Sequence, residues 1–526
     1  MGRIQVLDCT LRDGGYCNQW KFGYENAKKI ISSLVNAGVE IIECGFITKR
    51  VEYDNNITKF TDVAQIRGIL PQSNDDKMFV AMMNYGECDL KALPKYDGSS
   101  INGIRVAFHK KDAKEALKLC EAIKEKGYLV FIQAMVSLSY SDEEFLSMIK
   151  QVNDLEPYAF YIVDSFGEMK NSDLTRLYYL VEHNLKESIK IGFHSHNNIQ
   201  LAYSNAQTLV DMHTNRELII DSSVYGMGRG AGNLNTELFV EYLNENNGAN
   251  YDLKPLLTII DEILNDFYQR NYWGYSLPNY ISATHHAHPN YASYLDDKKT
   301  LTVENMNEIF DLIEDDKRVS FDKDYIEDLY IRFMTTGKVH EEHKLELEKM
   351  LRGKSILLIA AGKSSVNEKD KIINFSMKEN VVTISVNYDY SHVKTNFIFV
   401  SNLRRYRDID PSARGKCIVT SNVTSDGVYL QTKYWDLLAE DETVKDNAGM
   451  MAVKFLLTMG IKDIYLAGFD GYTHDSGENF GDNKMNVIMK NAVLDATNES
   501  MIRSLTRYSK VIDIHFLTTP KYVRID

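Results

Sequence analysis

The sequence has no run of 18 consecutive apolar residues, and this absence predicts a protein without a membrane-spanning helix. It also has no excess of basic side chains, because 60 lysines and arginines stand against 74 aspartates and glutamates, for a net charge of −14. A nucleic-acid backbone or an anionic lipid surface needs a dense basic face. Nucleic acid and membrane are therefore disfavoured as partners.

The cysteines show no CxxC spacing, which argues against both a zinc ribbon and a disulfide scaffold. The expected state is reduced, mostly buried thiols in a cytoplasmic protein. Hydrophobic residues make up 44% and charged residues 25% of the chain, which is an ordinary globular composition. Long disordered segments and a fibrous fold are excluded on that basis.

In the first half of the chain, short β-rich runs alternate with helical stretches. Each connection is long enough for a right-handed crossover, so the strands are expected to be parallel. The runs are almost continuously apolar, as expected for a sheet that helices cover. The eight runs occupy residues 4–9, 39–46, 78–84, 103–108, 128–135, 158–164, 190–194 and 217–222. They predict a (β/α)₈ TIM barrel over residues 1–290.

Beyond the predicted barrel, residues 291–352 are mainly polar and helical in pattern, and we expect a helical connector there. At Gly353 the pattern changes to apolar runs separated by turns and helices. This change predicts a second, Rossmann-like α/β domain over residues 353–526, with an open doubly wound sheet. The predicted fold class is α/β throughout.

Three metal-ligating side chains follow predicted strands one and seven. Asp13 lies just past the first strand, and His194 and His196 lie at the end of the seventh. Alternate residues of a strand point to the same side, so the two imidazoles can converge on one ion. In a barrel, the carboxyl ends of the strands surround the active site. Two histidines and one carboxylate suit Mn²⁺, Mg²⁺ or Co²⁺, and Zn²⁺ is an alternative.

Three segments carry a resemblance to a known family: residues 7–15, the histidine pair with Asn197 and Asn198, and residues 226–233. They resemble the metal-dependent aldolase and acyltransferase barrels that include 4-hydroxy-2-oxovalerate aldolase, hydroxymethylglutaryl-CoA lyase and isopropylmalate synthase. The resemblance implies a divalent metal held by Asp13, His194 and His196, with Asn233 at the metal in the lyase branch. It also implies that Arg12 stabilises an enolate, and that Glu43 supports the site.

The resemblance implies a lyase that forms or cleaves a 4-hydroxy-2-oxo acid, with pyruvate and an aldehyde as partners. Tyr16 stands where oxovalerate aldolases have a histidine base, so the proton-transfer group differs here. Tyr291 lies in a segment that resembles the one carrying a catalytic tyrosine, and a packed tyrosine is the alternative. The nearby His285, His286 and His288 could supply the base or form a solvated loop. The family barrels often dimerise, which is compatible with a homo-dimer.

A Claisen-type synthase that uses an acyl-CoA and a 2-oxo acid is a second hypothesis. The synthase branch has Glu-Gln after its Arg-Asp-Gly motif, where this chain has Gly15 and Tyr16, so the aldolase is favoured.

The last domain has a resemblance of its own. Residues 356–365, 385–387 and 449–470 resemble bacterial sialyltransferases that use CMP-sialic acid. The resemblance implies a CMP-type nucleotide or nucleotide-sugar ligand, contacted by Ser364, Ser365 and Asn387. The first loop lacks the Asn-Gly-Pro usual in that family, so we predict binding rather than transfer. A glycosyltransferase with the barrel as its scaffold is the third hypothesis. The fusion predicts a bifunctional protein of bacterial glycan or acidic-sugar metabolism.

Overall fold

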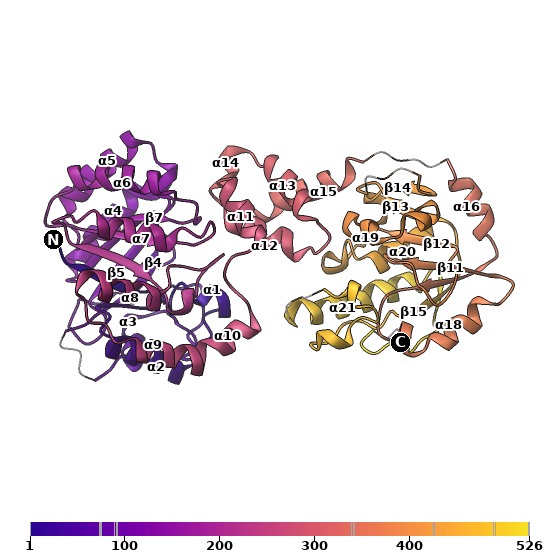
Figure 1. Cartoon of the computed structure of the whole chain (residues 1–526), viewed down its shortest axis with the longest axis horizontal. Coiled ribbons are helices and arrows are strands. Elements are labelled where there is room, and N and C mark those ends of the chain that lie inside the picture. Colours follow the sequence, from indigo (N-terminus) through magenta and orange to yellow (C-terminus); the bar gives the residue numbers. More distant parts are fainter. Residues whose placement is uncertain are drawn as a thin grey trace. The chain divides into compact units, whose positions relative to one another are not determined.

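The computed structural model describes residues 2–523 except 73–75, 89, 91, 92, 338, 340, 341, 424, 426, 488 and 490. The chain forms two compact units (Figure 1). The barrel unit comprises Met1–Ala292 with Glu314–Phe321, and the C-terminal unit comprises Ser293–Ile313 with Asp322–Asp526. The residues of the expected connector thus divide between the two units by their packing.

The barrel unit contains a closed, parallel sheet, which confirms the predicted TIM barrel. Strand β1 pairs with β9 on one side and with β2 on the other, and this closes the sheet. A short β3 (Lys59–Phe60) pairs in parallel with the end of β2. The eight barrel strands are β1 (Ile4–Asp8), β2 (Ile41–Ile47), β4 (Met78–Asn84), β5 (Gly103–Phe108), β6 (Leu129–Ala134), β7 (Ala159–Asp164), β8 (Lys190–Ser195) and β9 (Leu218–Ser222).

Helices surround this sheet because each carries an apolar stripe that must be buried. In α2 (Tyr24–Ala37), Ile30, Ile31 and Leu34 are buried at helical spacing, and Gly38 ends the helix with φ +97°. The other helices of the barrel unit are α1 (Gly15–Asn18), α3 (Val63–Ile66), α4 (Ala113–Glu125), α5 (Asp142–Leu155), α6 (Asn171–Asn184), α7 (Ala202–Asp211), α8 (Thr236–Asn247), α9 (Leu253–Ile259), α10 (Asn265–Arg270), α11 (Leu277–Thr284) and α14 (Asp315–Arg318). Helix α12 (Pro289–Asp297) contains the division between the units.

The C-terminal unit contains a second parallel sheet, which confirms the predicted second α/β unit. Its strand order is β14-β13-β12-β11-β10-β15-β16, and every neighbouring pair is parallel. The strands are β10 (Ser355–Ile359), β11 (Val381–Val386), β12 (Phe397–Val400), β13 (Cys417–Thr420), β14 (Leu430–Thr432), β15 (Asp463–Ala467) and β16 (Asp513–Phe516). The helices are α13 (Val303–Asp311), α15 (Lys323–Thr335), α16 (Lys344–Leu351), α17 (Ser364–Asn367), α18 (Lys369–Ser376), α19 (Leu403–Asp408), α20 (Ala448–Thr458) and α21 (Asn491–Tyr508).

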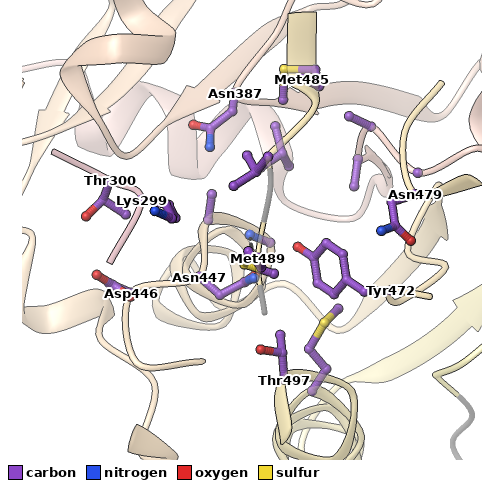
Figure 2. Close-up of a pocket in the computed structure, with 18 of the residues that line it drawn as sticks. Lys299, Thr300, Asn387, Asp446, Asn447, Tyr472, Asn479, Met485, Met489 and Thr497 are labelled. Atoms are coloured by element: carbon purple, nitrogen blue, oxygen red, sulfur yellow. Dashed lines mark hydrogen bonds between the residues drawn. The ribbon is translucent and has the colours of Figure 1, made fainter. Parts of the chain in front are cut away.

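A cavity of about 270 Å³ lies at the carboxyl ends of β10, β11, β12 and β15 (Figure 2). The chain winds outward in one direction from β10 and in the other from β15, so these two neighbours form the topological switch point of the sheet. Ligands of open α/β sheets bind at such points. Among the described residues, no helix is both long and apolar enough to cross a membrane.

Candidate active site

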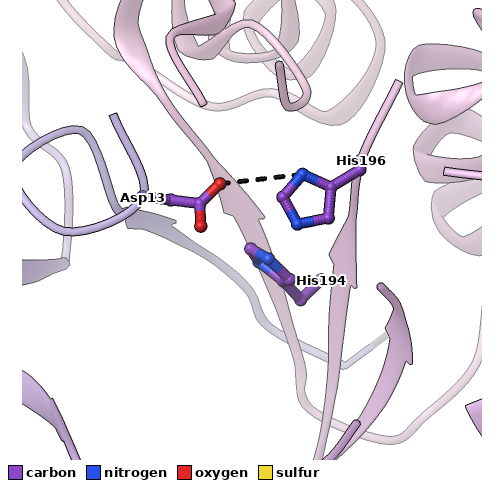
Figure 3. Close-up of side chains that lie close together, drawn as sticks. All are labelled: Asp13, His194 and His196. Carbon is purple, nitrogen blue, oxygen red and sulfur yellow. Dashed lines mark ion pairs between the residues drawn. The ribbon is translucent and has the colours of Figure 1, made fainter. Parts of the chain in front are cut away.

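The structure brings Asp13, His194 and His196 together at the carboxyl end of the barrel (Figure 3). One ligand atom from each lies within 4.8 Å of the others, and all three side chains are buried. Asp13 follows β1, while the histidines sit at alternate positions at the end of β8 and just after it. Their rings lie 5.1 Å apart and nearly perpendicular, at 87°. This arrangement leaves ring nitrogens of both residues facing one point.

The imidazole of His194 is oriented by Asp221, which lies in β9. The Nδ1 atom of His194 is 2.9 Å from a carboxylate oxygen of Asp221. The carboxylate accepts a hydrogen bond there, so Nδ1 carries the hydrogen and Nε2 keeps its lone pair for a ligand bond. Asp221 also forms an ion pair with the fully buried Arg105, whose guanidinium lies 2.8 Å from Glu43.

The guanidinium of Arg12 completes this chain of charges. Its Nε donates to Glu43 over 2.7 Å, and one terminal nitrogen pairs with Asp13. Two basic and three acidic side chains thus alternate through the barrel interior, in the order Asp13, Arg12, Glu43, Arg105, Asp221. The sequence pattern did not single out Asp221. The available signal was an acidic residue directly after the apolar run 218–220, at the end of a predicted strand.

Burial and neighbouring charge set the protonation of the trio. Burial by itself raises the pKa of Asp13, but Arg12 and the two histidines outweigh it and hold that pKa well below its usual range. Burial lowers the pKa of His196 to about 3, against the attraction of Asp13. At neutral pH the carboxylate is charged and the imidazole is neutral. These are the states that metal ligation requires.

Several buried polar atoms of the site have no hydrogen-bond partner among the described residues. They include Arg12 Nη2, His196 Nδ1 and Asn233 Oδ1. Buried polar atoms are nearly always satisfied in folded proteins, so such a concentration is typical of groups that bind a ligand. Asn233 is held beside Asp13 by a 2.8 Å hydrogen bond from Nδ2 to Asp13 Oδ2. Two imidazoles, a carboxylate and an amide oxygen fit a divalent cation.

Glycine at position 228 is required by this packing. A Cβ atom there would lie 2.5 Å from Asn233 Nδ2 and 2.9 Å from Asp13 Oδ2. The loop of residues 226–233 can therefore approach the carboxylate only because Gly228 has no side chain.

Tyr16 lies in α1, next to the trio, and 42% of its surface is exposed. Its ring packs edge-on against Trp20, with ring centroids 4.8 Å apart. The guanidinium carbon of Arg229 lies 5.7 Å from the Tyr16 centroid. Tyr16 thus occupies the mouth of the barrel.

Tyr291, the other candidate tyrosine, is fully buried. Its hydroxyl lies 3.0 Å from the carbonyl oxygen of Lys317 and 2.9 Å from that of Ser320. These contacts hold residues 314–321 against the barrel. They are those of a packed, structural tyrosine, the alternative to a catalytic role. Tyr291 is therefore not part of the catalytic set that we propose below.

Of the residues expected to contact a nucleotide, only Asn387 lines the C-terminal cavity. The Ser364 amide donates to Asp470 over 2.7 Å, and its hydroxyl contacts Asp470 and Thr518. Ser365 is 1% exposed, and its carbonyl accepts the hydroxyl of Tyr390. Ser364 therefore ties the loop after β10 to the loop after β15, and Ser365 is buried outside the cavity lining.

Residues 3–263 match the family model described as HMGL-like. Over 270 residues the chain is 26% identical to a 4-hydroxy-2-oxovalerate aldolase of Pseudoalteromonas translucida (strain TAC 125), covering 50% of this chain and 76% of that protein. It is 28% identical over 245 residues to a 4-hydroxy-2-oxovalerate aldolase of Geobacillus genomosp. 3, with 46% and 70% covered. A solved N-terminal domain of a candidate aldolase from Bacteroides vulgatus is 28% identical, with a TM-score of 0.48, covering 57% of this chain and 98% of that one.

Proposed function

Because residues 3–263 match the HMGL-like family model, we propose that the barrel unit is a divalent-metal-dependent aldolase. The proposed reaction forms or cleaves a 4-hydroxy-2-oxo acid through the enolate of pyruvate. The observation that carries the proposal is the buried convergence of Asp13, His194 and His196 beside an arginine with a free donor. The relatives named 4-hydroxy-2-oxovalerate aldolase support the same reaction class.

Asp13, His194 and His196 would hold the cation, and Asn233 Oδ1 lies beside them as a further oxygen donor. When bound, the cation supplies Lewis-acid stabilisation of the negative charge that develops on the enolate oxygen. Arg12 adds a fixed positive charge. Glu43 and Asp13 hold two of its nitrogens, so Nη2 is left as a preoriented donor for a substrate oxygen.

Tyr16 is the proton-transfer group in this proposal. Burial raises the pKa of Tyr16 above the ordinary phenol value of about 10, with Arg229 acting in the opposite direction, so the phenol is protonated at neutral pH and its hydroxyl can donate. In the condensation direction, the enolate carbon attacks the aldehyde carbon and the aldehyde oxygen takes the phenolic proton. In cleavage, the phenolate oxygen takes the proton back from the substrate hydroxyl. Glu43 acts as a positioning residue, through Arg12.

The test is pyruvate release from a 4-hydroxy-2-oxo acid, together with exchange of the pyruvate methyl protons in D₂O, both with added Mn²⁺. We expect His194→Ala to abolish both signals. The matched control is His183→Ala, because His183 is 70% exposed at the end of α6. Undiminished exchange in His194→Ala would refute the metal assignment. Thiol release from acetyl-CoA in the presence of 2-oxo acids would favour the Claisen-type synthase instead.

For the C-terminal unit, we propose that the cavity at the switch point binds a CMP-type nucleotide or a nucleotide-sugar. Asn387, Asn447 and Tyr472 line it, and they offer amide groups and an aromatic face (Figure 2). The hydroxyl of the buried Ser401 also lines it and has no hydrogen-bond partner among the described residues. A bifunctional protein of bacterial glycan or acidic-sugar metabolism is consistent with both sites.

Calorimetry with CMP tests this second proposal. Ser401→Ala is expected to weaken CMP binding about five- to tenfold, because it removes one neutral hydrogen bond. Ser385→Ala is the matched control, since Ser385 Oγ is likewise buried and without a partner but lies outside the cavity lining. Absence of CMP binding to the wild type would refute the assignment.

A further inference from the structure

Arg229 extends across the barrel mouth from the loop after β9. Its backbone nitrogen is 3.5 Å from Asp13 Oδ2, so the residue begins next to the proposed metal ligands. One terminal nitrogen donates to the carbonyl oxygen of Ser165, after β7, over 2.7 Å. The guanidinium also lies beside the ring of Tyr16. The side chain is thus held in place by one hydrogen bond and one aromatic contact.

The charge of Arg229 is not neutralised within the described part of the chain. Arg12 and Arg105, two buried arginines of the barrel interior, each pair with two carboxylates. No carboxylate lies within ion-pair distance of Arg229 among the described residues. A half-buried guanidinium that uses one of its five N–H donors in a side-chain hydrogen bond has the remaining donors available for an anion.

Two histidines near Arg229 add neutral polar groups to the mouth. Burial lowers the pKa of His109, and Lys111 and Arg229 lower it further. Burial, followed by Arg229 and His109, holds the pKa of His288 well below its usual range. His288 Nδ1 accepts the backbone N–H of Asn290 over 3.1 Å, so its Nε2 carries the proton and is a donor. The carboxylate that interacts with Arg229 is Asp13, which already pairs with Arg12 and is a proposed metal ligand, whereas His109 and His288 are neutral.

We propose that Arg229 is the anchor for an anionic group on the acceptor aldehyde, a carboxylate or a phosphate. The inference rests on the aldolase function proposed above, because Tyr16 there donates its proton to the aldehyde oxygen. Arg229 lies beside Tyr16, so an anionic group bound to Arg229 would be carried by the aldehyde, the substrate whose oxygen faces the Tyr16 hydroxyl. In that reaction the cation and Arg12 would bind the oxygens of pyruvate, which leaves Arg229 for the other substrate. The geometry thus assigns an acidic or phosphorylated aldehyde as the second substrate.

The test compares three aldehydes in the full-length protein with Mn²⁺ and pyruvate: propanal, succinic semialdehyde and glyceraldehyde 3-phosphate. We expect kcat/KM of the wild type to be about 10- to 100-fold higher for at least one anionic aldehyde than for propanal, the effect of one or two charge-assisted hydrogen bonds. Arg229→Gln is expected to reduce this difference at least about tenfold, whatever its effect on the propanal value. Arg229→Lys, which keeps the charge, is expected to restore part of it. The anionic aldehyde with the higher kcat/KM shows whether the site binds a carboxylate or a phosphate.

Arg176→Gln is the matched control, because Arg176 pairs with Asp142 on the outer surface. A binding measurement without catalysis completes the test: calorimetry with succinate and with inorganic phosphate in the presence of EDTA. The wild type is expected to bind one of them at least tenfold more tightly than Arg229→Gln. Thermal unfolding of each variant shows whether it is folded.

Equal kcat/KM for neutral and anionic aldehydes in the wild type would overturn the inference, and so would an equal loss for all three aldehydes in Arg229→Gln. Exchange of pyruvate methyl protons in D₂O reports the proposed function without any acceptor. If the wild type exchanges these protons but does not favour anionic aldehydes, the inference alone fails. If there is no exchange, the aldolase proposal fails, and the calorimetry with EDTA still decides whether Arg229 is an anion site.

Discussion

Replacing Asp221 by asparagine removes the carboxylate that stands between Arg105 and His194 in the barrel interior. Arg105 is fully buried and Asp221 is 1% exposed, so water cannot replace the lost charge. Glu43 remains as a partner of Arg105, but Arg12 shares its charge. Removing one member of a buried ion pair costs about 3–5 kcal/mol, because the other charge stays buried without compensation. We expect a loss of about 3 kcal/mol in the free energy of unfolding of the barrel unit.

The assay uses the position of the three tryptophans. Trp20 and Trp273 lie in the barrel unit and Trp435 in the C-terminal unit, so fluorescence in a Trp435→Phe background reports the barrel. Urea unfolding in the presence of EDTA then measures the stability of that unit without metal. The matched control is Asp142→Asn, which removes a surface ion pair with Arg176 and is expected to cost less than about 1 kcal/mol.

A double variant tests the cause of the loss. In Arg105→Met with Asp221→Asn, both charges of the pair are gone, so the loss is expected to be smaller than the sum of the two single losses. Additive losses, or a loss below about 1 kcal/mol for Asp221→Asn alone, would refute the reasoning that this carboxylate is needed to neutralise Arg105.

Further predictions concern three other sites of the barrel unit. Burial raises the pKa of Asp8 to about 6, against hydrogen bonds from Thr236 and Thr10. The protonated Asp8 thus stabilises the fold fully below about pH 4, and this stabilisation is lost as the pH rises through 6. Asp8→Asn should remove about 3 kcal/mol of the pH dependence of the free energy of unfolding across that window. A urea midpoint with the same pH profile in wild type and variant would contradict this. Tyr291→Phe should lower stability by about 1–2 kcal/mol, because it removes the hydroxyl that bonds the carbonyls of residues 317 and 320, and should keep pyruvate exchange within about twofold. Lost exchange at intact stability would instead support the catalytic alternative. Gly228→Ala should weaken Mn²⁺ binding in calorimetry at least about tenfold by displacing Asp13 or Asn233, whereas Gly415→Ala, with open space around its Cβ, should not.

Local patterns were sufficient for the architecture. Continuous apolar runs with long connections predicted the barrel strands, because a sheet that is covered on both faces buries every residue of a strand. All seven residues of β2 and all six of β5 are buried. The His-x-His spacing predicted the juxtaposition of His194 and His196 for a similarly local reason, since alternate residues of one strand share a face.

Tertiary structure alone decided which polar side chains meet. Arg105 and Asp221 are 116 residues apart, and only the closure of the barrel brings them together inside it. Ser364 meets Asp470 and Thr518 across 106 and 154 residues. Its amide and hydroxyl, which the sequence suggested for a nucleotide, are therefore bonded within the protein. Tyr291 binds carbonyls 26 and 29 residues away, although its own segment resembles a catalytic one. Periodicity and composition act between neighbours in the chain, whereas the partner of a buried polar atom depends on how distant strands and loops pack.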